Sequence, residues 1–161
     1  MNYIVYDKAK WHYGPGSQPM GLPAKVGAIH IAFFLRWCVE NEMVEKEVLE
    51  ELGHFNVTGK DWIDYPEFLV THFSGVLDEE LLNERGQAFA KEYYNDDTTK
   101  MAVHYDWYLQ DYDTWVEQLF GPMYNAKTSM YEVEFDEENY KAVAEMIDRR
   151  YAQFLDFTAV R

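Results

Sequence analysis

The chain of 161 residues carries 29 aspartates and glutamates against 14 lysines and arginines, which gives a formal net charge of −15 at pH 7. That charge repels phosphate backbones and anionic lipids, so it argues against nucleic acid and membranes as partners. Hydrophobic residues make up 48% of the sequence and aromatic residues 17%, a composition that excludes intrinsic disorder and predicts a single domain over residues 1–161.

The first predicted element is a short β-prone run at residues 3–6, either a strand or an extended anchor. The N-terminal residues lack the basic start and the long apolar stretch of a secretory signal. A loop rich in glycine and proline follows up to residue 22 and carries Trp11 and His12. Aromatic side chains in such a loop are expected to hold it against the core, and a platform for a ligand is the less favoured interpretation.

Residues 23–39 form the central element of the predicted fold. Val26, Ile29 and Phe33 follow helical spacing, and apolar side chains also cover the other sides, which predicts a buried helix. Polar and charged residues interrupt the stretch too often for a membrane span. Cys38, the only cysteine, lies in this helix, so no disulfide can form within the chain. We therefore expect a cytoplasmic protein.

Three shorter helices are predicted next. Residues 40–51 combine glutamates with an apolar stripe, which indicates a helix with an acidic outer face that ends at Gly53. Residues 66–73 and 78–94 are expected to form the other two. Gly86 lies inside the last of them, where glycine costs about 1 kcal/mol relative to alanine, so we expect it to permit a close helix contact.

The longest regular pattern runs from Met101 to Leu119, where large side chains recur three and four residues apart, as along one continuous helix. Residues 130–135 alternate as a strand does, and Asp136 is placed to cap a final helix. The predicted fold is mainly α: a bundle of about five to seven helices around the buried 23–39 helix, with a minor two-stranded ribbon at about 3–6 and 130–135.

Common catalytic and metal-binding motifs are absent from the sequence, which has no phosphate-binding glycine loop, no paired-cysteine or H-E-x-x-H zinc motif and no G-x-S-x-G elbow. His104 with Asp106, and Asp111 with Asp113, offer ligand types for a metal. Residues two apart point in different directions on a helix, so a solvated face is the favoured interpretation. No metal site, cofactor or catalytic residue is expected.

Among the histidines, His30 is the strongest candidate for a chemical role, because the predicted helix places it among apolar side chains. One interpretation is a tuned acid–base group paired with His12, or with a carboxylate such as Asp61 or Asp64. The candidate pocket consists of Trp11, His12, His30 and Trp37. The other interpretation, which is favoured, is a neutral core histidine that bonds a backbone carbonyl or a tyrosine hydroxyl.

Four motifs give the chain a resemblance to a known family. They are Y-D-x-A-x-W-H-Y at residues 6–13, G-A-x-H-I-x-x-F-L-x-W at 27–37, L-N-x-x-G-x-A-F-A-x-x-Y-Y at 82–94 and D-R-R-Y-x-x-F at 148–154. Together they resemble an uncharacterised bacterial family of small acidic proteins, a domain of unknown function. The resemblance implies a bacterial cytosolic protein, similar in size and character to immunity proteins that neutralise bacterial toxins, and it carries over no catalytic residue.

These observations predict a cytosolic binding protein, an immunity-type inhibitor that neutralises a cognate toxin through an acidic, tyrosine-rich surface. The expected partner is a basic toxin domain. The candidate contact residues are Glu42, Glu45, Asp106, Asp113 and Glu117. Two alternatives stay open: a small enzyme or ligand-binding protein with a His12/His30 pocket, and a structural subunit that assembles through the aromatic side of residues 101–119.

Overall fold

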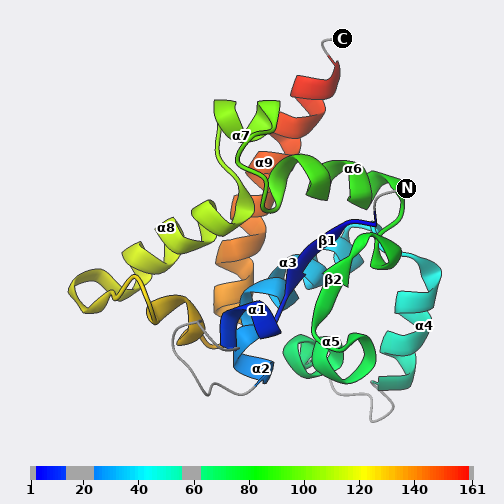
Figure 1. Ribbon diagram of the computed structural model, residues 1–161, viewed down its shortest axis with the longest axis horizontal. Helices are drawn as coiled ribbons and strands as arrows, with labels where there is room; N and C mark the ends of the chain where they lie inside the picture. The colour runs from blue at the N-terminus through cyan, green and yellow to red at the C-terminus, as the bar shows by residue number, and fades with distance from the viewer. Residues whose placement is uncertain (1–2, 14–23, 56–62, 160–161) are drawn as a thin grey trace.

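The computed structural model describes residues 3–13, 24–55 and 63–159, and over these ranges the protein is mainly helical with a small antiparallel sheet (Figure 1). This confirms the predicted fold class. The predicted central helix is present as α2, Ala24–Gly27, and α3, Ile29–Glu40, which are separated at Ala28. Pro23, the expected first residue of that helix, lies outside the described residues.

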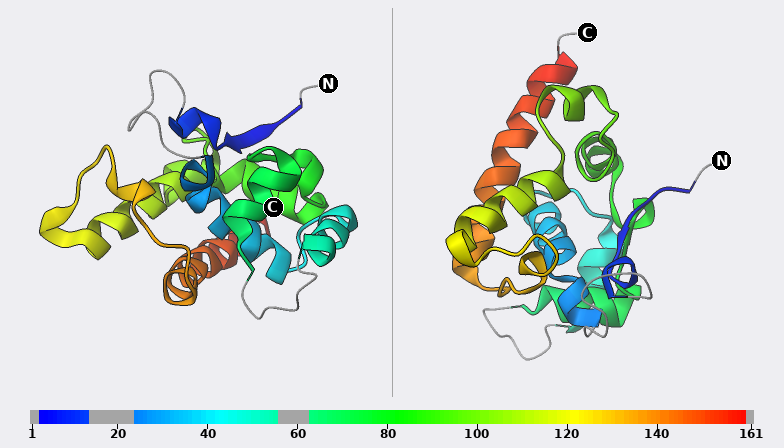
Figure 2. Two further views of the ribbon diagram at one scale, coloured as in Figure 1. Left: turned by 90° about the horizontal axis from the view of Figure 1, so that it is seen from below. Right: turned by 60° about the vertical axis from the view of Figure 1, so that its left-hand side comes forward.

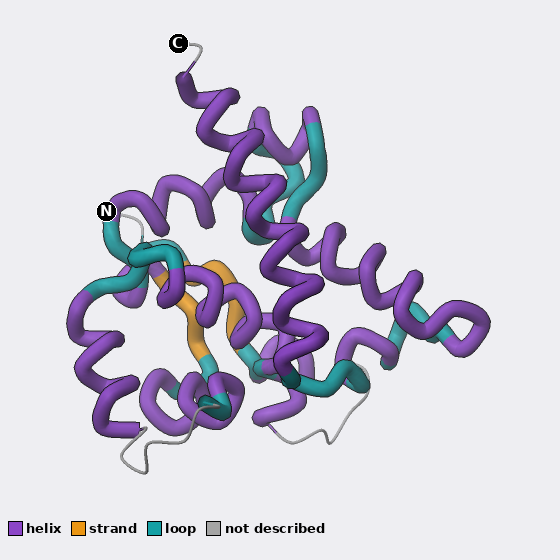
Figure 3. The backbone as a smooth tube through the Cα atoms, turned by 180° about the vertical axis from the view of Figure 1, so that it is seen from behind, coloured by secondary structure: helices purple, strands orange, loops and turns teal. Residues whose placement is uncertain are grey.

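Helix α3 is the centre of the core. Its side chains from His30 to Cys38 are buried, with the exception of Arg36. Helices α5, Tyr65–Phe73, and α9, Glu137–Ala159, pack along it. The β ribbon lies on the near side of α3 in Figure 1, whereas α9 lies on the near side of the molecule in the view from behind (Figure 3). A helix that is apolar on almost every side requires this enclosure.

The ribbon pairs β1, Val5–Lys8, with β2, Val76–Asp78, in antiparallel register. A two-stranded ribbon is therefore confirmed, but the predicted strand at 130–135 is wrong. That stretch holds η3, the 3-10 turn Ser129–Tyr131, followed by loop. Val133 is buried and the ring of Phe135 lies 4.7 Å from that of Phe33. The alternation thus reflects side chains that point inwards at every second position, not a strand.

The acidic helix after α3 begins later than predicted and does not end at Gly53. Helix α3 runs on to Glu40 and is capped at Asn41, after which Glu42 turns the chain with a φ of 58°. Helix α4 then spans Lys46–Phe55. Because the glutamates continue through the turn, charge pattern alone does not show where one helix ends and the next begins.

The predicted 78–94 helix is divided in two. Its first part is the 3-10 turn η1, Glu79–Leu81, and the rest is helix α6, Glu84–Tyr93, which is capped at its N-terminus by the side chain of Asn83. Gly86 faces the connection between α3 and α4, where a Cβ atom would lie 2.4 Å from the carbonyl oxygen of Met43. The expected close contact is confirmed, although its partner is the backbone of a turn. Only glycine fits this approach without a backbone shift.

Replacing Gly86 with alanine is expected to lower the free energy of unfolding by about 2 kcal/mol, because the added methyl group must displace the Met43 backbone. Gly53→Ala in α4 is the matched control. No atom lies within 4 Å of its Cβ position, and alanine favours the helix there by about 1 kcal/mol. Urea unfolding of both variants measures the difference, and a Gly86→Ala protein as stable as the wild type would contradict the close approach.

The predicted 101–119 helix is two helices, α7, Lys100–His104, and α8, Tyr108–Phe120. Tyr105 leaves helical geometry with φ −117° and ψ −80°, and Trp107 is extended. The 3-10 turn η2, Gly121–Met123, follows α8. The aromatic side chains of the pattern point mostly into the core, with Tyr108 and Tyr112 fully buried. The surface expected to mediate assembly is therefore largely covered by the chain itself.

The last helix, α9, begins directly after Asp136, as predicted. The side chain of Asp136 caps it by accepting a hydrogen bond from the backbone N–H of Asn139 at 2.8 Å. Phe135 and Tyr140 both contact the ring of Phe33 and anchor the entry of the helix. The C-terminal end of α9 extends beyond the body of the protein, with α7 beside it (Figures 1 and 2). Over the described residues, none of the helices combines the length and the apolar character that a membrane crossing needs.

Candidate functional site

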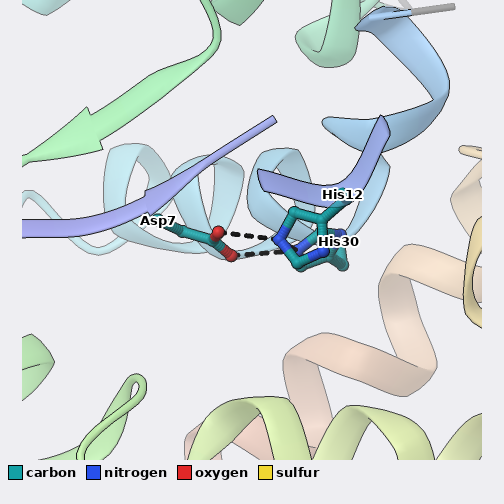
Figure 4. A group of neighbouring side chains, drawn as sticks. All are labelled: Asp7, His12 and His30. Carbon is teal, nitrogen blue, oxygen red and sulfur yellow. Dashed lines mark hydrogen bonds and ion pairs between the residues drawn. The ribbon is translucent and has the colours of Figure 1, made fainter. Parts of the chain in front are cut away.

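The candidate site is a cluster of Asp7, His12 and His30, which meet near the C-terminal end of β1 (Figure 4). Asp7 lies in β1 and is 1% exposed. Its Oδ1 atom is 2.8 Å from Nε2 of His12, and its Oδ2 atom is 2.9 Å from Nε2 of His30. The hydroxyl of Tyr94 donates a further hydrogen bond to Oδ2 at 2.9 Å. One buried carboxylate thus serves both imidazole rings.

A tight turn after β1 brings His12 back over Asp7. Ala9 donates its backbone N–H to the carbonyl of Gly75 at 2.8 Å, and the N–H of His12 donates to the carbonyl of Ala9 at 3.0 Å. The short helix α1, Lys10–Tyr13, starts there. Ala9 is buried against Gly75, where a Cβ atom would lie only 3.0 Å from that of Ala9. Small residues at this crossing allow the turn to close.

His30 belongs to the first turn of α3 and is completely buried. Its backbone carbonyl accepts a hydrogen bond from the hydroxyl of Tyr108 at 2.6 Å, which ties this turn to α8. The ring of His30 bonds Asp7 through Nε2, whereas its Nδ1 atom is buried without a hydrogen-bond partner among the described residues. The His30 ring is therefore fixed by a hydrogen bond at Nε2 but not at Nδ1.

His12 is the most accessible member of the cluster, with 15% of its side chain exposed. Its Nδ1 atom lies 2.9 Å from the hydroxyl of Tyr131, in η3. The rings of His12 and His30 meet edge to face with their centroids 4.3 Å apart, and their Nε2 atoms are separated by 3.2 Å. Both Nε2 atoms therefore face the same carboxylate and each other.

The charge state of the cluster follows from burial and hydrogen bonding. Burial raises the pKa of the Asp7 carboxyl, but its interactions with His30 and His12 outweigh burial and hold that pKa well below its usual range. Burial lowers the pKa of His30, against the opposing influence of Asp7. Asp7 is thus an anion, and burial disfavours the charged form of the His30 ring beside it. Because an ionised carboxylate only accepts, each Nε2 atom that bonds it is assigned a proton.

The structure brings two of the four predicted pocket residues together and leaves two apart. His12 and His30 meet as the alternative interpretation requires, and His30 bonds a carboxylate and not only a backbone group. Trp11 lies on α1 with the ammonium group of Lys8 5.8 Å from its ring, and at 47% exposure its side chain is not enclosed in the core. Trp37 lies about two helical turns beyond His30 and donates to Asp148 of α9, so it does not line this cluster.

The carboxylate partner of the histidines is Asp7, which sequence reasoning missed. Asp64 instead caps α5 and pairs with Lys25. Asp61 lies outside the described residues. The available signal was the motif at residues 6–13, which places an aspartate five residues before His12. Its meaning depends on the turn after β1, and no periodicity predicts that turn.

The five predicted partner-binding acids lie on two separate parts of the surface. Glu42 and Glu45 are exposed in the turn between α3 and α4. On and before α8, Glu117 is exposed, whereas Asp106 and Asp113 are half-buried and Asp113 accepts a hydrogen bond from Tyr124 at 2.7 Å. Helices α4 and α8 lie on opposite sides of the molecule in Figures 1 and 2. These acids therefore cannot contribute to one continuous contact patch.

The acids considered as metal ligands on the 101–119 pattern have other roles. Asp111 accepts from both Nε and Nη2 of Arg150, at 2.9 and 3.0 Å, and from the hydroxyl of Tyr93 at 2.7 Å. The ring of His104 packs against Tyr105 with centroids 5.3 Å apart. In the part of the chain that the structure describes, Asp7, His12 and His30 are the group whose ligand atoms converge, all within 4.8 Å of one another.

The family model for a domain of unknown function (DUF7832) matches residues 5–133, and the chain belongs to this family. The matched range includes all three residues of the cluster. The comparison with curated proteins found no match. The comparison with solved structures found none either. Membership of an uncharacterised family agrees with the resemblance drawn from the motifs, whereas the likeness to immunity proteins stays a prediction.

Proposed function

We propose that this member of the DUF7832 family is a small enzyme or ligand-binding protein whose working site is the Asp7–His12–His30 cluster. The observation that carries the proposal is the convergence of two imidazole rings on a single buried carboxylate. The three residues come from β1, α1 and α3, so the fold itself assembles them. Clusters of titratable side chains held in this way are typical of functional sites.

A purely structural role explains the cluster less well. Apolar side chains fill a core without desolvating a charge, and replacing buried ionic groups by apolar ones is often neutral or stabilising. Here the core holds an anion at Asp7 and leaves Nδ1 of His30 without a hydrogen-bond partner among the described residues. Both features cost stability. A cluster of this kind is retained more readily when it serves a ligand than when it only fills space.

Exposure of the three side chains indicates how a ligand would approach. Asp7 and His30 are sealed, whereas His12 reaches the surface, so the ligand contacts the cluster at the His12 edge. Asp7 gives that edge a negative potential, and the net charge of −15 adds to it. The preferred ligand is therefore small and carries positive charge or hydrogen-bond donors.

Thermal unfolding in the presence of small polar ligands tests this proposal. In buffer with a chelator, we expect at least one cationic or donor-rich compound to stabilise the wild type, by about 2.7 kcal/mol at a concentration 100 times its Kd. His12→Asn should abolish that stabilisation, whereas His72→Asn, a change at the separate His72–Glu51 pair, should retain it. Equal responses of the wild type and His12→Asn would overturn the proposal.

A second candidate function is the inhibitor of a basic partner, an immunity-type protein that acts in the cytoplasm. It is supported by the net charge of −15 and by the exposure of Glu42, Glu45 and Glu117. Acidic surfaces speed association with a basic protein and make the rate sensitive to salt. Because the acids lie on opposite sides of the molecule, one of the two surfaces would carry the contact.

Capture of a basic partner from the native bacterium, followed by kinetics on the isolated pair, tests the inhibitor. The variants Glu42→Lys/Glu45→Lys and Asp113→Lys/Glu117→Lys reverse charge on one side each. We expect one of the two to slow association by about tenfold or more at low salt and the other to leave the rate nearly unchanged. An association rate that neither variant changes, or that salt does not change, would exclude electrostatic recognition through these acids.

A further inference from the structure

We propose that Asp7, His12 and His30 bind a divalent transition-metal ion such as Zn²⁺, through the Asp7 carboxylate and the Nε2 atoms of both histidines. The inference rests on the proposed ligand-binding role of the same cluster and names its ligand. Two imidazoles and a carboxylate form a ligand set that zinc and iron proteins use. The sequence has no metal motif at these positions, because the ligands come from three elements.

The spacing of the ligand atoms fits a common ion. Zinc bonds nitrogen and oxygen ligands at about 2.0–2.1 Å in tetrahedral geometry, so two ligands on one ion lie about 3.3–3.4 Å apart. The corresponding separations here are 2.8 Å and 2.9 Å between the carboxylate oxygens and the two Nε2 atoms, and 3.2 Å between the Nε2 atoms. Figure 4 shows both rings turned with these nitrogens towards Asp7. The separations are shorter than this distance, so the ligand atoms would move apart by roughly half an ångström to take up a zinc ion.

The contact between the two histidines is better explained with a cation than without one. In the metal-free cluster both Nε2 atoms carry protons directed at Asp7, which puts two donors 3.2 Å apart. A metal ion would replace both protons and turn the same two nitrogens into lone-pair donors. The positive charge would also compensate the buried Asp7 carboxylate. The cation would thus remove the contact between two donors and compensate the carboxylate, while Nδ1 of His30 stays without a partner among the described residues.

The surroundings of the two rings permit the required change of tautomer. When Nε2 of His12 binds a metal, its proton moves to Nδ1, which faces the Tyr131 hydroxyl at 2.9 Å. A hydroxyl accepts as readily as it donates, so this bond is kept. Nδ1 of His30 has no partner among the described residues that would prevent the same shift.

Contacts outside the three ligands resemble those of established metal sites. The Tyr131 hydroxyl holds the His12 ring from behind, and the Tyr94 hydroxyl orients the Asp7 carboxylate. Such second contacts orient ligands and typically affect metal affinity 10- to 100-fold. Three protein ligands leave at least one coordination position open, on the side where His12 reaches the surface. Mg²⁺ and Ca²⁺ prefer oxygen ligands and fit two imidazoles poorly.

Isothermal titration of Zn²⁺ into the chelator-stripped, full-length protein tests the inference. We expect one ion to bind per chain, and His12→Asn to weaken binding by at least about 100-fold, the upper range seen for the loss of a second contact. Tyr131→Phe should weaken it by about tenfold. His72→Asn is the matched control, because that histidine bonds Glu51 at 3.0 Å but has no third ligand nearby among the described residues. Its affinity should equal that of the wild type.

A second readout uses Co²⁺, whose visible absorption reports coordination by protein ligands. The wild type should develop this absorption and His12→Asn should lose it. Circular dichroism verifies that each variant is folded, and the partly exposed His12 is the ligand whose replacement disturbs the core least. Equal Zn²⁺ affinity in the wild type and His12→Asn would overturn the metal site, as would the absence of stoichiometric binding.

The outcomes separate the metal from the broader proposal. If Zn²⁺ does not bind but a small ligand stabilises the chelated wild type and not His12→Asn, the metal inference fails and the ligand-binding role stands. If Zn²⁺ binds at the cluster and the chelated protein responds to no small ligand, the metal inference stands and direct binding of an organic ligand by the metal-free cluster fails. If neither is observed, both fail.

Discussion

Replacing Asp111 with alanine is expected to lower the free energy of unfolding by about 3 kcal/mol, because it breaks a largely buried ion pair by removing one partner. Asp111 of α8 accepts two hydrogen bonds from Arg150 of α9 and one from Tyr93 of α6. Its side chain is 10% exposed and that of Arg150 20%. The alanine variant would leave the guanidinium and the tyrosine hydroxyl without their acceptor at the junction of three helices.

Denaturant unfolding of three variants separates this effect from a general sensitivity of α8. Glu117→Ala, on the exposed side of the same helix, should change stability by no more than about 0.5 kcal/mol. The double variant Asp111→Ala/Arg150→Met should be more stable than Asp111→Ala alone, because it also removes the unpaired charge. A single variant that loses less than about 1 kcal/mol would show that the pair is not a significant link between the helices.

Much of the fold could be predicted because burial leaves a periodic trace in the sequence. The stretch after residue 23 is apolar on almost every side and therefore requires enclosure, and most side chains of α3 are buried. The N-terminal cap of the last helix could also be predicted: Asp136 precedes α9, and its side chain accepts a hydrogen bond from the first turn as expected. Each of these inferences depends on neighbours within a few positions along the chain.

The predictions of a helix at 101–119 and a strand at 130–135 failed because a periodic pattern of buried side chains does not specify the backbone conformation. The pattern from Met101 to Leu119 continues across the break between α7 and α8, because Met101 of α7 and Tyr108 and Tyr112 of α8 are buried in the same core. The alternation at 130–135 comes from a loop that buries Val133 and packs Phe135 on Phe33. Periodicity reports which side chains point inwards. It does not report whether the backbone is continuous or paired.

The candidate site was predictable only in part for a related reason. His12 and His30 could be paired as a hypothesis, since one lies in the loop before the helix that carries the other. The choice of Asp7 over Asp61 or Asp64 depends on the direction in which β1 leads into α1. That direction is set by pairing with β2, about 70 residues away in sequence. Long-range pairing of this kind has no local signature.

Replacing Asp7 with asparagine is expected to lower the free energy of unfolding by about 3 kcal/mol in the metal-free protein. The substitution keeps the shape of the side chain but exchanges an acceptor for an amide whose N–H₂ group must face a donor. Asp7 accepts from Tyr94, from both imidazoles and from the backbone N–H of Lys8. Breaking a buried, charge-assisted network on one side typically costs several kcal/mol.

His12→Asn provides the comparison that gives the Asp7 result its meaning. His12 is partly exposed and makes two hydrogen bonds in the cluster, so its replacement should cost only about 1 kcal/mol. Urea unfolding in the presence of a chelator measures both variants against the wild type. If Asp7→Asn proved as stable as the wild type or more so, the carboxylate would contribute nothing to folding. Its place in the core would then depend entirely on what the cluster binds, because a buried charge that does not stabilise the fold is retained only for function.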